Sequence, residues 1–249
     1  GAAVWHISWG DKDDLVGWQA YFHERNRFIT ALLHSPYARG GRLVRESNYM
    51  DVKHLISMQY YTEAGRLMAL HDILAGPDQL HDILDERIKQ IRTMAGEYSD
   101  AVFKPRVDEF PTPRTTKPPR RGQGFSQPSV AGLVPWAVKT LVRQIGLPVK
   151  ELSKERPQAH IAHQDNKWWR MAQYDSAVVS NADGTAASWY RRDPEVVRKN
   201  LAEATRLHGR ILAEWPRLRA AYREALPRIT SLEEWGRTFE RHTESELTR

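Results

Sequence analysis

The residues best able to do chemistry stand close together near the beginning of the chain. Residues 4–14, VWHISWGDKDD, hold one histidine, two tryptophans and three aspartates. His6 lies at the end of a segment that we predict to be a strand, a position from which side chains often reach into a site. A neutral imidazole is a good ligand for a divalent metal, although a lone histidine there is more often a hydrogen-bonded structural residue. Trp9, in the turn that follows, can stack on a sugar ring or form the rim of the core.

Two of the aspartates, Asp11 and Asp13, have the Asp-x-Asp spacing by which many glycosyltransferases hold a divalent metal on a nucleotide diphosphate. That motif usually follows a long apolar strand, whereas here it opens a predicted helix. Acidic residues are favoured in the first turn of a helix because they offset the helix dipole. Helix capping therefore explains these aspartates, and we do not assign them to a metal site.

The helix that follows carries a further candidate, His23. Apolar residues at helical spacing predict one buried face, and Gln19, His23 and Asn26 form a polar stripe beside it. A histidine close to a helix N-terminus is suited to binding a diphosphate. A surface histidine without such a role is about equally expected. Two weaker pairs of candidates are His160 with His163 and Trp168 with Trp169.

The composition narrows the classes of protein. The 249 residues include no cysteine, which excludes a disulfide framework, a zinc ribbon and a thiol nucleophile. No apolar run in the sequence approaches the roughly 20 residues that span a bilayer. No Walker, dinucleotide-binding, nucleophile-elbow or His-Glu-x-x-His motif is present in it. The net charge of +6 is partly concentrated in the Pro- and Gly-rich segment 104–128, which suits nucleic acid, anionic lipid or an acidic ligand as well as a solvated linker.

The elements that must position these residues are mostly helices. The pattern predicts a mainly α (α+β) fold with one short strand at the start and one β-hairpin in the second half. The hairpin joins the strand-like segments 171–180 and 185–190 through the turn Asn181-Ala182-Asp183-Gly184. The predicted helical segments of the first half are residues 11–35, a region from 47 to 75 that ends at Gly76-Pro77, and a helix from 78 to 94. In the second half we predict a short helix at 135–145 and a long helix from Asp193 with a kink at Pro216. A last helix begins with a capping box of Ser231 and Glu234.

The sequence resembles the polymerising galactofuranosyltransferases that build the cell-wall galactan of mycolate-bearing bacteria. The resemblance extends over the whole chain. It rests on residues 4–9, the acidic helix start, residues 18–27 (WQAYFHERNR), Trp168-Trp169, the Asn181 hairpin and the helix from Asp193. It implies an inverting glycosyltransferase of the GT-A type that transfers galactofuranose from UDP-galactofuranose to a lipid-linked galactan, with alternating β-(1→5) and β-(1→6) links.

The resemblance also implies roles for individual residues. The residue matching His6 is a ligand of the divalent metal, Mn²⁺ or Mg²⁺, and the residues matching Trp9 and His23 line the pocket for donor and acceptor. The family's Asp-x-Asp motif and its catalytic base fall before Gly1. Because the chain also begins without a methionine, we expect it to be a C-terminal fragment or a processed form that is inactive by itself.

The expected domain organisation follows from the resemblance and the composition. It consists of the C-terminal end of a GT-A catalytic domain (1–36), a helical region (37–103), a basic Pro-rich loop (104–128), and C-terminal helices with a β-hairpin at about 168–190 (129–249). The resemblance further implies a homotetramer on the cytoplasmic, inner face of the plasma membrane, with peripheral membrane contact for which the basic loop is a candidate. Nucleic acid is not expected as a partner. The alternative hypothesis is a basic helical module without catalysis, which serves oligomerisation or binds a membrane or nucleic acid.

Overall fold

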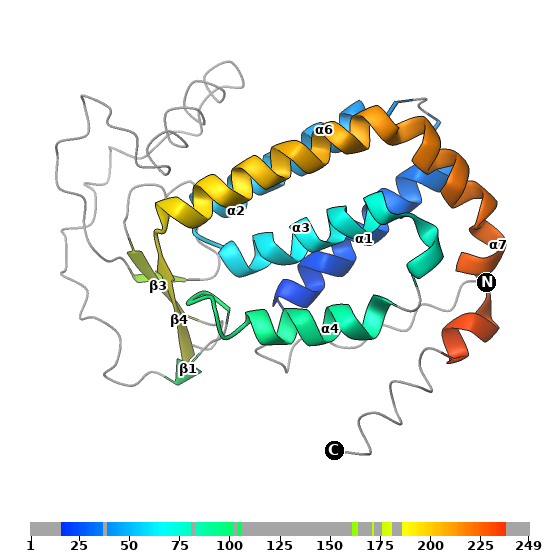
Figure 1. Cartoon of the computed structure of the whole chain (residues 1–249). Coiled ribbons are helices and arrows are strands. Elements are labelled where there is room, and N and C mark those ends of the chain that lie inside the picture. The colour runs from blue at the N-terminus through cyan, green and yellow to red at the C-terminus, as the bar shows by residue number, and fades with distance from the viewer. Residues whose placement is uncertain are drawn as a thin grey trace.

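Four helices form the centre of the molecule. The computed structural model describes residues 16–36, 39–80, 83–101, 104–105, 161–163, 171, 176–180 and 186–237. The central helices are α1 (Val16–His34), α2 (Gly41–Ile56), α3 (Tyr60–Ala75) and α6 (Pro194–Glu224). Helix α3 packs against α1 and α6, and α2 also packs against α6. Figure 1 shows α4 on the opposite side of α1 and α3 from α6.

The main core lies between α1, α3 and α6, as the spacing of their apolar residues predicts. Its largest side chains are buried aromatic and branched residues from all three helices. They include Phe28 and Leu32 from α1, Leu70 and Ile73 from α3, and Leu207, Ile211, Trp215, Leu218 and Tyr222 from α6. Helix α1, which the sequence assigns to the preceding domain, therefore shares its core with the helices that follow it. The domain boundary at residue 36 stays a prediction.

The region predicted to be helical from 47 to 75 is divided into two helices. Helix α2 begins earlier, at Gly41, and ends at Ile56, and α3 starts at Tyr60. The break occurs at Met58, whose φ of 60° lies in the left-handed region. Its side chain is fully buried and packs with Met171 and with Val179 of the sheet. Burial of this side chain offsets the cost of the backbone conformation.

The end of α3 follows the prediction, whereas the next helix starts later than predicted. Gly76 has a φ of 102°, which glycine adopts without a steric penalty. Pro77 then opens a 3₁₀ turn, Pro77–Gln79, where the sequence suggested the start of the next α-helix. Helix α4 itself covers Ile83–Met94.

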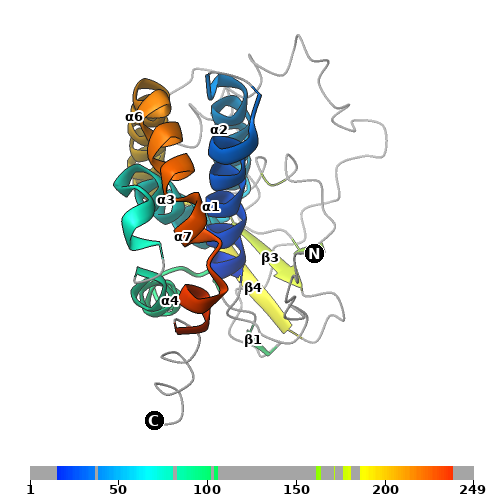
Figure 2. The same cartoon turned by 90° about the vertical axis from the view of Figure 1, so that its right-hand side faces the viewer.

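The predicted hairpin is confirmed. Strand β3 (Ser176–Ser180) pairs antiparallel with β4 (Ala186–Arg191). Two short strands extend the sheet to the order β1-β4-β3-β2: β1 (Lys104–Pro105) pairs antiparallel with β4, and β2 (Ile161–His163) pairs parallel with β3. Pro105 stands on an edge strand, where a missing N–H is tolerated. The sheet lies beside the end of the helical layer at which α6 begins (Figures 1 and 2).

The C-terminal helices begin as the sequence predicts. The Asp193 carboxylate accepts hydrogen bonds from the backbone N–H groups of Glu195 and Val196, with Pro194 in the first turn of α6. Pro216 stands inside α6, and Figure 1 shows the helix bending in its C-terminal half. The short helix α7 (Leu226–Ile229) follows, and then a helix at 232–237.

One of the two hydrogen bonds of the predicted capping box is present at the last helix: the Glu234 N–H donates to Ser231 Oγ at 3.4 Å. None of the helices in the described ranges is long and apolar enough to cross a bilayer. The predicted opening strand, the short helix at 135–145, the Trp168-Trp169 pair, the hairpin turn and the basic loop beyond residue 105 lie outside the described residues.

Candidate functional site

Of the three predicted site residues, the structure describes His23 only. His6 and Trp9 lie outside the described residues. His23 is exposed on α1, Asn26 beside it is exposed as well, and Gln19 is half-buried. The predicted polar stripe of α1 therefore faces solvent, and the imidazole of His23 is accessible to a ligand.

The opposite face of α1 is bonded to Asp72 of α3, and the same carboxylate also binds α4. The fully buried Tyr21 donates its hydroxyl proton to Asp72 Oδ2 of α3 at 2.6 Å. Arg87 of α4 donates from Nη2 to Asp72 Oδ1, also at 2.6 Å. Burial raises the pKa of the Tyr21 hydroxyl well above its usual value, so this group remains a hydrogen-bond donor at any physiological pH.

The residue next to His23, Glu24, is fully buried. Its carboxylate accepts hydrogen bonds from Arg66 Nη1 at 2.6 Å, from Arg27 Nη2 at 2.9 Å and from the Ser47 hydroxyl. Burial by itself favours the neutral acid, but the positive charges of Arg66 and Arg27 and the Ser47 bond hold the pKa of Glu24 below its ordinary value. Glu24 is therefore a buried carboxylate, and its partners come from α1, α2 and α3.

Arg66 is the centre of this buried group. Besides Glu24 it binds Asp51 Oδ1, through Nη2 at 2.7 Å and Nε at 3.2 Å. It also donates from Nη2 to the backbone oxygen and the hydroxyl of Ser47, each at 3.0 Å. Glu63 Oε2 lies 3.5 Å from Arg66 Nε. The neighbouring carboxylates outweigh burial and raise the pKa of Arg66 further, so its guanidinium carries a permanent positive charge.

Two histidines complete the group, which we call the Arg66 cluster: Glu24, Ser47, Asp51, His54, Glu63, Arg66 and His208. His54 Nδ1 lies 3.3 Å from Glu63 Oε2. His208 of α6 lies with Nε2 3.0 Å from Ser47 Oγ and with Nδ1 3.5 Å from Asp51 Oδ2. Burial lowers the pKa of His54 to about 3 and also lowers that of His208. Both imidazoles are therefore neutral at pH 7.

One guanidinium thus faces three carboxyl groups. Burial raises the pKa of Asp51 to about 7, and the charge of Glu63 adds to this effect. Burial likewise raises the pKa of Glu63 to about 7. Uncompensated buried charge is costly. Protonation of these two acids near neutral pH therefore brings the negative charge of the cluster closer to the single positive charge of Arg66.

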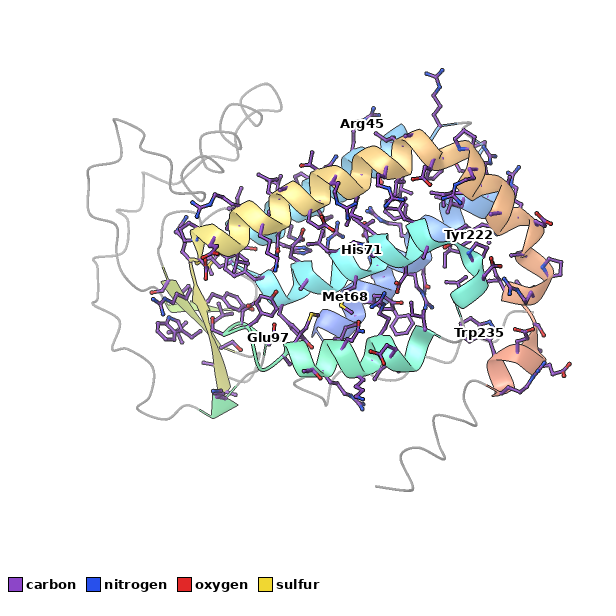
Figure 3. All side chains as sticks on the ribbon, viewed as in Figure 1. Arg45, Met68, His71, Glu97, Tyr222 and Trp235 are labelled. Atoms are coloured by element: carbon purple, nitrogen blue, oxygen red, sulfur yellow. The ribbon has the colours of Figure 1, made fainter. Side chains whose placement is uncertain are left out.

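The cluster holds four helices together and is sealed from solvent. Its members come from α1, α2, α3 and α6, and each is at most 6% exposed. Figure 3 shows the space between α3 and α6 filled by side chains. At the surface of the same contact His71, labelled there, pairs with Glu203 at 2.6 Å. Because the cluster is buried and its members come from four helices, it fixes the orientation of α1 relative to α2, α3 and α6.

The sequence did not identify this cluster. Charged residues are rarely buried unless they are paired, and their partners here lie on other helices. The one signal is in α3, where Glu63 and Arg66 stand among residues that form a buried stretch, including Ala64, Leu67 and Leu70. Within the described ranges, no three His, Asp or Glu side chains are placed so that they can hold a metal ion.

Comparisons with known proteins agree with the resemblance seen in the sequence. A family model described as galactofuranosyltransferase-2, domain 3, matches residues 43–241. The chain is 34% identical over 235 residues to the galactofuranosyltransferase GlfT2 of Mycolicibacterium smegmatis. It is also 34% identical over 244 residues to the GlfT2 of Mycobacterium tuberculosis. Each alignment covers 94% of this chain but 36% of the relative, so the chain spans little more than a third of the length of these relatives. The chain belongs to the galactofuranosyltransferase-2 family, and residues 43–241 match domain 3 of that family.

Proposed function

We propose that this chain is the C-terminal part of a galactofuranosyltransferase that transfers galactofuranose from UDP-galactofuranose to a lipid-linked galactan. The family match over residues 43–241 carries this proposal, and the names of both relatives support it. Inversion at the anomeric carbon and alternation of β-(1→5) and β-(1→6) links are part of the proposal. They rest on the resemblance of residues 4–27 to the family.

In this proposal α1 delivers His23 to the donor site. The transfer leaves negative charge on the departing diphosphate, and a hydrogen bond from an accessible imidazole stabilises that charge more in the transition state than in the ground state. Such a bond is effective only if the donor is already oriented. The bonds of Glu24 to Arg66 and of Tyr21 to Asp72 hold α1 at two adjacent turns, which supports this role for His23. Trp9 would offer a flat apolar face to a sugar ring.

A divalent metal, Mn²⁺ or Mg²⁺, belongs to the proposal as well. When bound, it neutralises the charge on the leaving diphosphate. His6 is the proposed ligand, because a neutral imidazole suits such a metal. The described residues offer no alternative group for it. Replacement of His6 by alanine in the intact enzyme should abolish transfer while leaving folding unchanged, and near-normal turnover at ordinary metal concentrations would reject the ligand role.

The proposal is tested by the variants His23→Ala and His34→Ala of the intact enzyme. His34 is a matched control, since it is also exposed and ends the same helix. Eleven residues separate the two histidines, which is about three turns, so they share a helix face roughly 16 Å apart. Loss of a transition-state hydrogen-bond donor costs on the order of 10² in kcat/KM. We expect a loss of that size for His23→Ala and normal transfer for His34→Ala. Equal activity of the two variants, with unchanged circular dichroism, would contradict the assignment.

The oligomeric state and the location follow the same resemblance. We propose a homotetramer that rests on the inner, cytoplasmic face of the plasma membrane, where a lipid-linked acceptor is available. The basic segment 104–121 is the proposed contact with anionic lipid. Flotation of the intact enzyme with anionic vesicles should be lost when the arginines at 114, 120 and 121 are replaced by glutamine. Flotation that does not depend on these residues would remove the segment from the proposal.

A further inference from the structure

A pocket of about 470 Å³ opens on the surface shared by α1 and α2. A volume of several hundred cubic ångströms is typical of small-ligand sites. The residues that line it are Arg27 from α1 and Arg42, Arg45, Glu46, Tyr49 and Met50 from α2. We call it the arginine pocket. The residues from α2 recur at spacings of three and four, which places them along one side of that helix.

The charges in the arginine pocket are not balanced. Its lining holds three arginines and one carboxylate, that of Glu46. Glu46 lies 3.0 Å from Arg42 Nε, and Arg27 is paired with Glu24 at 2.9 Å, so Arg45 is left without a carboxylate among the described residues. Arg45 is exposed and forms no ion pair with any residue in the described part of the chain. It stands at the outer side of the helices in Figure 3. The pocket therefore attracts an anion.

The arginines favour an oxyanion over a simple halide, because guanidinium groups present forked pairs of N–H donors that match the oxygens of carboxylate and phosphate. Among oxyanions a phosphate carries more negative charge and more acceptor oxygens than a carboxylate. Arg42 lies in the first turn of α2, where the helix dipole adds positive potential. Tyr49, one turn after Arg45, is 49% exposed and offers an aromatic face beside the charged groups. Nucleic acid would call for a basic surface longer than one such pocket.

We propose that the arginine pocket binds the phosphate or diphosphate group of a small ligand, with Arg42 and Arg45 on the phosphate oxygens and Tyr49 against the group that carries it. Arg27 stands one turn after His23, roughly 6 Å along α1. The pocket thus lies beside the proposed donor face but needs neither the donor sugar nor a metal. Arg27 is already held by the buried Glu24 at 2.9 Å, so it forms a fixed wall of the pocket.

The test is binding of inorganic pyrophosphate to the intact enzyme in the presence of EDTA, measured by calorimetry. EDTA removes the metal on which the proposed donor site depends, and the variant His23→Ala should bind pyrophosphate like the wild type. Arg45→Glu should weaken binding at least tenfold. The matched control is Arg198→Glu, the same charge reversal at an exposed position near the start of α6. Arg198 lies 17 residues before Trp215, roughly 25 Å along the helix, and Trp215 adjoins Gly40 at the start of α2.

The outcomes distinguish the sources of the phosphate group. The vesicles are phosphatidylcholine with phosphatidic acid, and they are tested on enzyme whose arginines at 114, 120 and 121 are replaced by glutamine, so that the basic segment does not bind them. If they bind this enzyme and its Arg198→Glu variant but not its Arg45→Glu variant, the ligand is a lipid headgroup. If pyrophosphate alone shows this pattern, the ligand is soluble. If Arg45→Glu and Arg198→Glu weaken binding of the probe equally, the loss comes from the change in net charge and not from the arginine pocket. That result, or no binding of either probe by the wild type, would overturn the proposal. Loss of pyrophosphate binding in His23→Ala would also overturn it as a separate site.

Discussion

Arg66 of α3 donates a hydrogen bond to Glu24 of α1 across 2.6 Å, and both side chains are almost completely buried. Removing two charges from water costs several kcal/mol per ion, and a bare ion pair does not offset that cost. Here further hydrogen bonds stabilise both partners: Glu24 also accepts from Ser47 and Arg27, and Arg66 also donates to Asp51. The pair therefore specifies how α1 sits on α3, and with it the direction in which the neighbouring His23 points.

The first prediction concerns Arg66 itself. Arg66→Met keeps much of the side-chain volume but leaves Glu24, Asp51 and Glu63 without their shared cation. Breaking a buried pair in this way costs about 3–5 kcal/mol, which urea unfolding of the chain should detect as a fall in the transition midpoint. Arg206→Met is the control, because Arg206 is bound to Glu203 at the surface, where ion pairs contribute little. A similar shift for both variants would show that the cluster does not stabilise the fold.

The second prediction concerns two adjacent glycines. A Cβ added at Gly40 would lie 2.4 Å from the Trp215 ring, whereas one added at Gly41 would meet nothing within 4 Å. The backbone at Gly40 has a φ of −76°, which suits any residue, so the effect of Gly40→Ala is purely one of packing. Overpacking of this kind costs about 1–3 kcal/mol.

Gly41→Ala should be neutral or stabilising by up to ~1 kcal/mol, since alanine is the better helix former. Thermal unfolding of the two variants provides the comparison. If Gly40→Ala is as stable as Gly41→Ala, the close contact between α2 and the Trp215 ring is not present in solution.

The third prediction is a dependence on pH. The pKa of Asp51 is raised to about 7 in the folded chain, chiefly by burial, from an ordinary value of 3.8. An acid with a raised folded pKa binds more protons in the native state, so its contribution to stability is complete below pH 4 and is lost as the pH rises to 7. His54 and His208 act in the opposite direction, because their lowered pKa values favour the folded chain above pH 6.5.

The contribution of Asp51 is therefore measured as a difference from the wild type. The stability of Asp51→Asn relative to the wild type should rise between pH 4 and pH 7, with a slope of at most about 1.4 kcal/mol per pH unit, the value for one proton. Urea unfolding at several pH values measures this slope. A difference that does not change with pH would show that the pKa of Asp51 is not raised in the folded chain.

Local signals predicted much of the fold. Asp193 and Pro194 mark the start of α6, and Gly76 marks the end of α3. The strand-like segments on either side of the predicted turn form the hairpin. Each of these features is decided by a few neighbouring residues, which is why the sequence shows it. The break between α2 and α3 carries no such signal. Met58 takes a left-handed φ because its side chain is buried against Met171 and Val179, and these are contacts between distant segments.

The candidate site was likewise predictable only where the signal is local. His23 could be placed on an exposed polar stripe from its spacing to Gln19 and Asn26 alone. Glu24 and Arg66 look like surface residues by type, and only the approach of α1, α2, α3 and α6 makes them partners. The arginine pocket was missed for the same reason, since Arg27 and Arg42 come from different helices.

The most direct test of the account is the affinity of the intact enzyme for UDP in the presence of Mn²⁺. If His23 contacts the diphosphate from its fixed helix, His23→Ala should weaken UDP roughly tenfold, about 1.4 kcal/mol, which is close to the lower limit for a hydrogen bond to a charged group. His34→Ala should bind UDP as the wild type does. Equal dissociation constants for the wild type and His23→Ala would contradict the central claim that α1 presents a donor-binding residue.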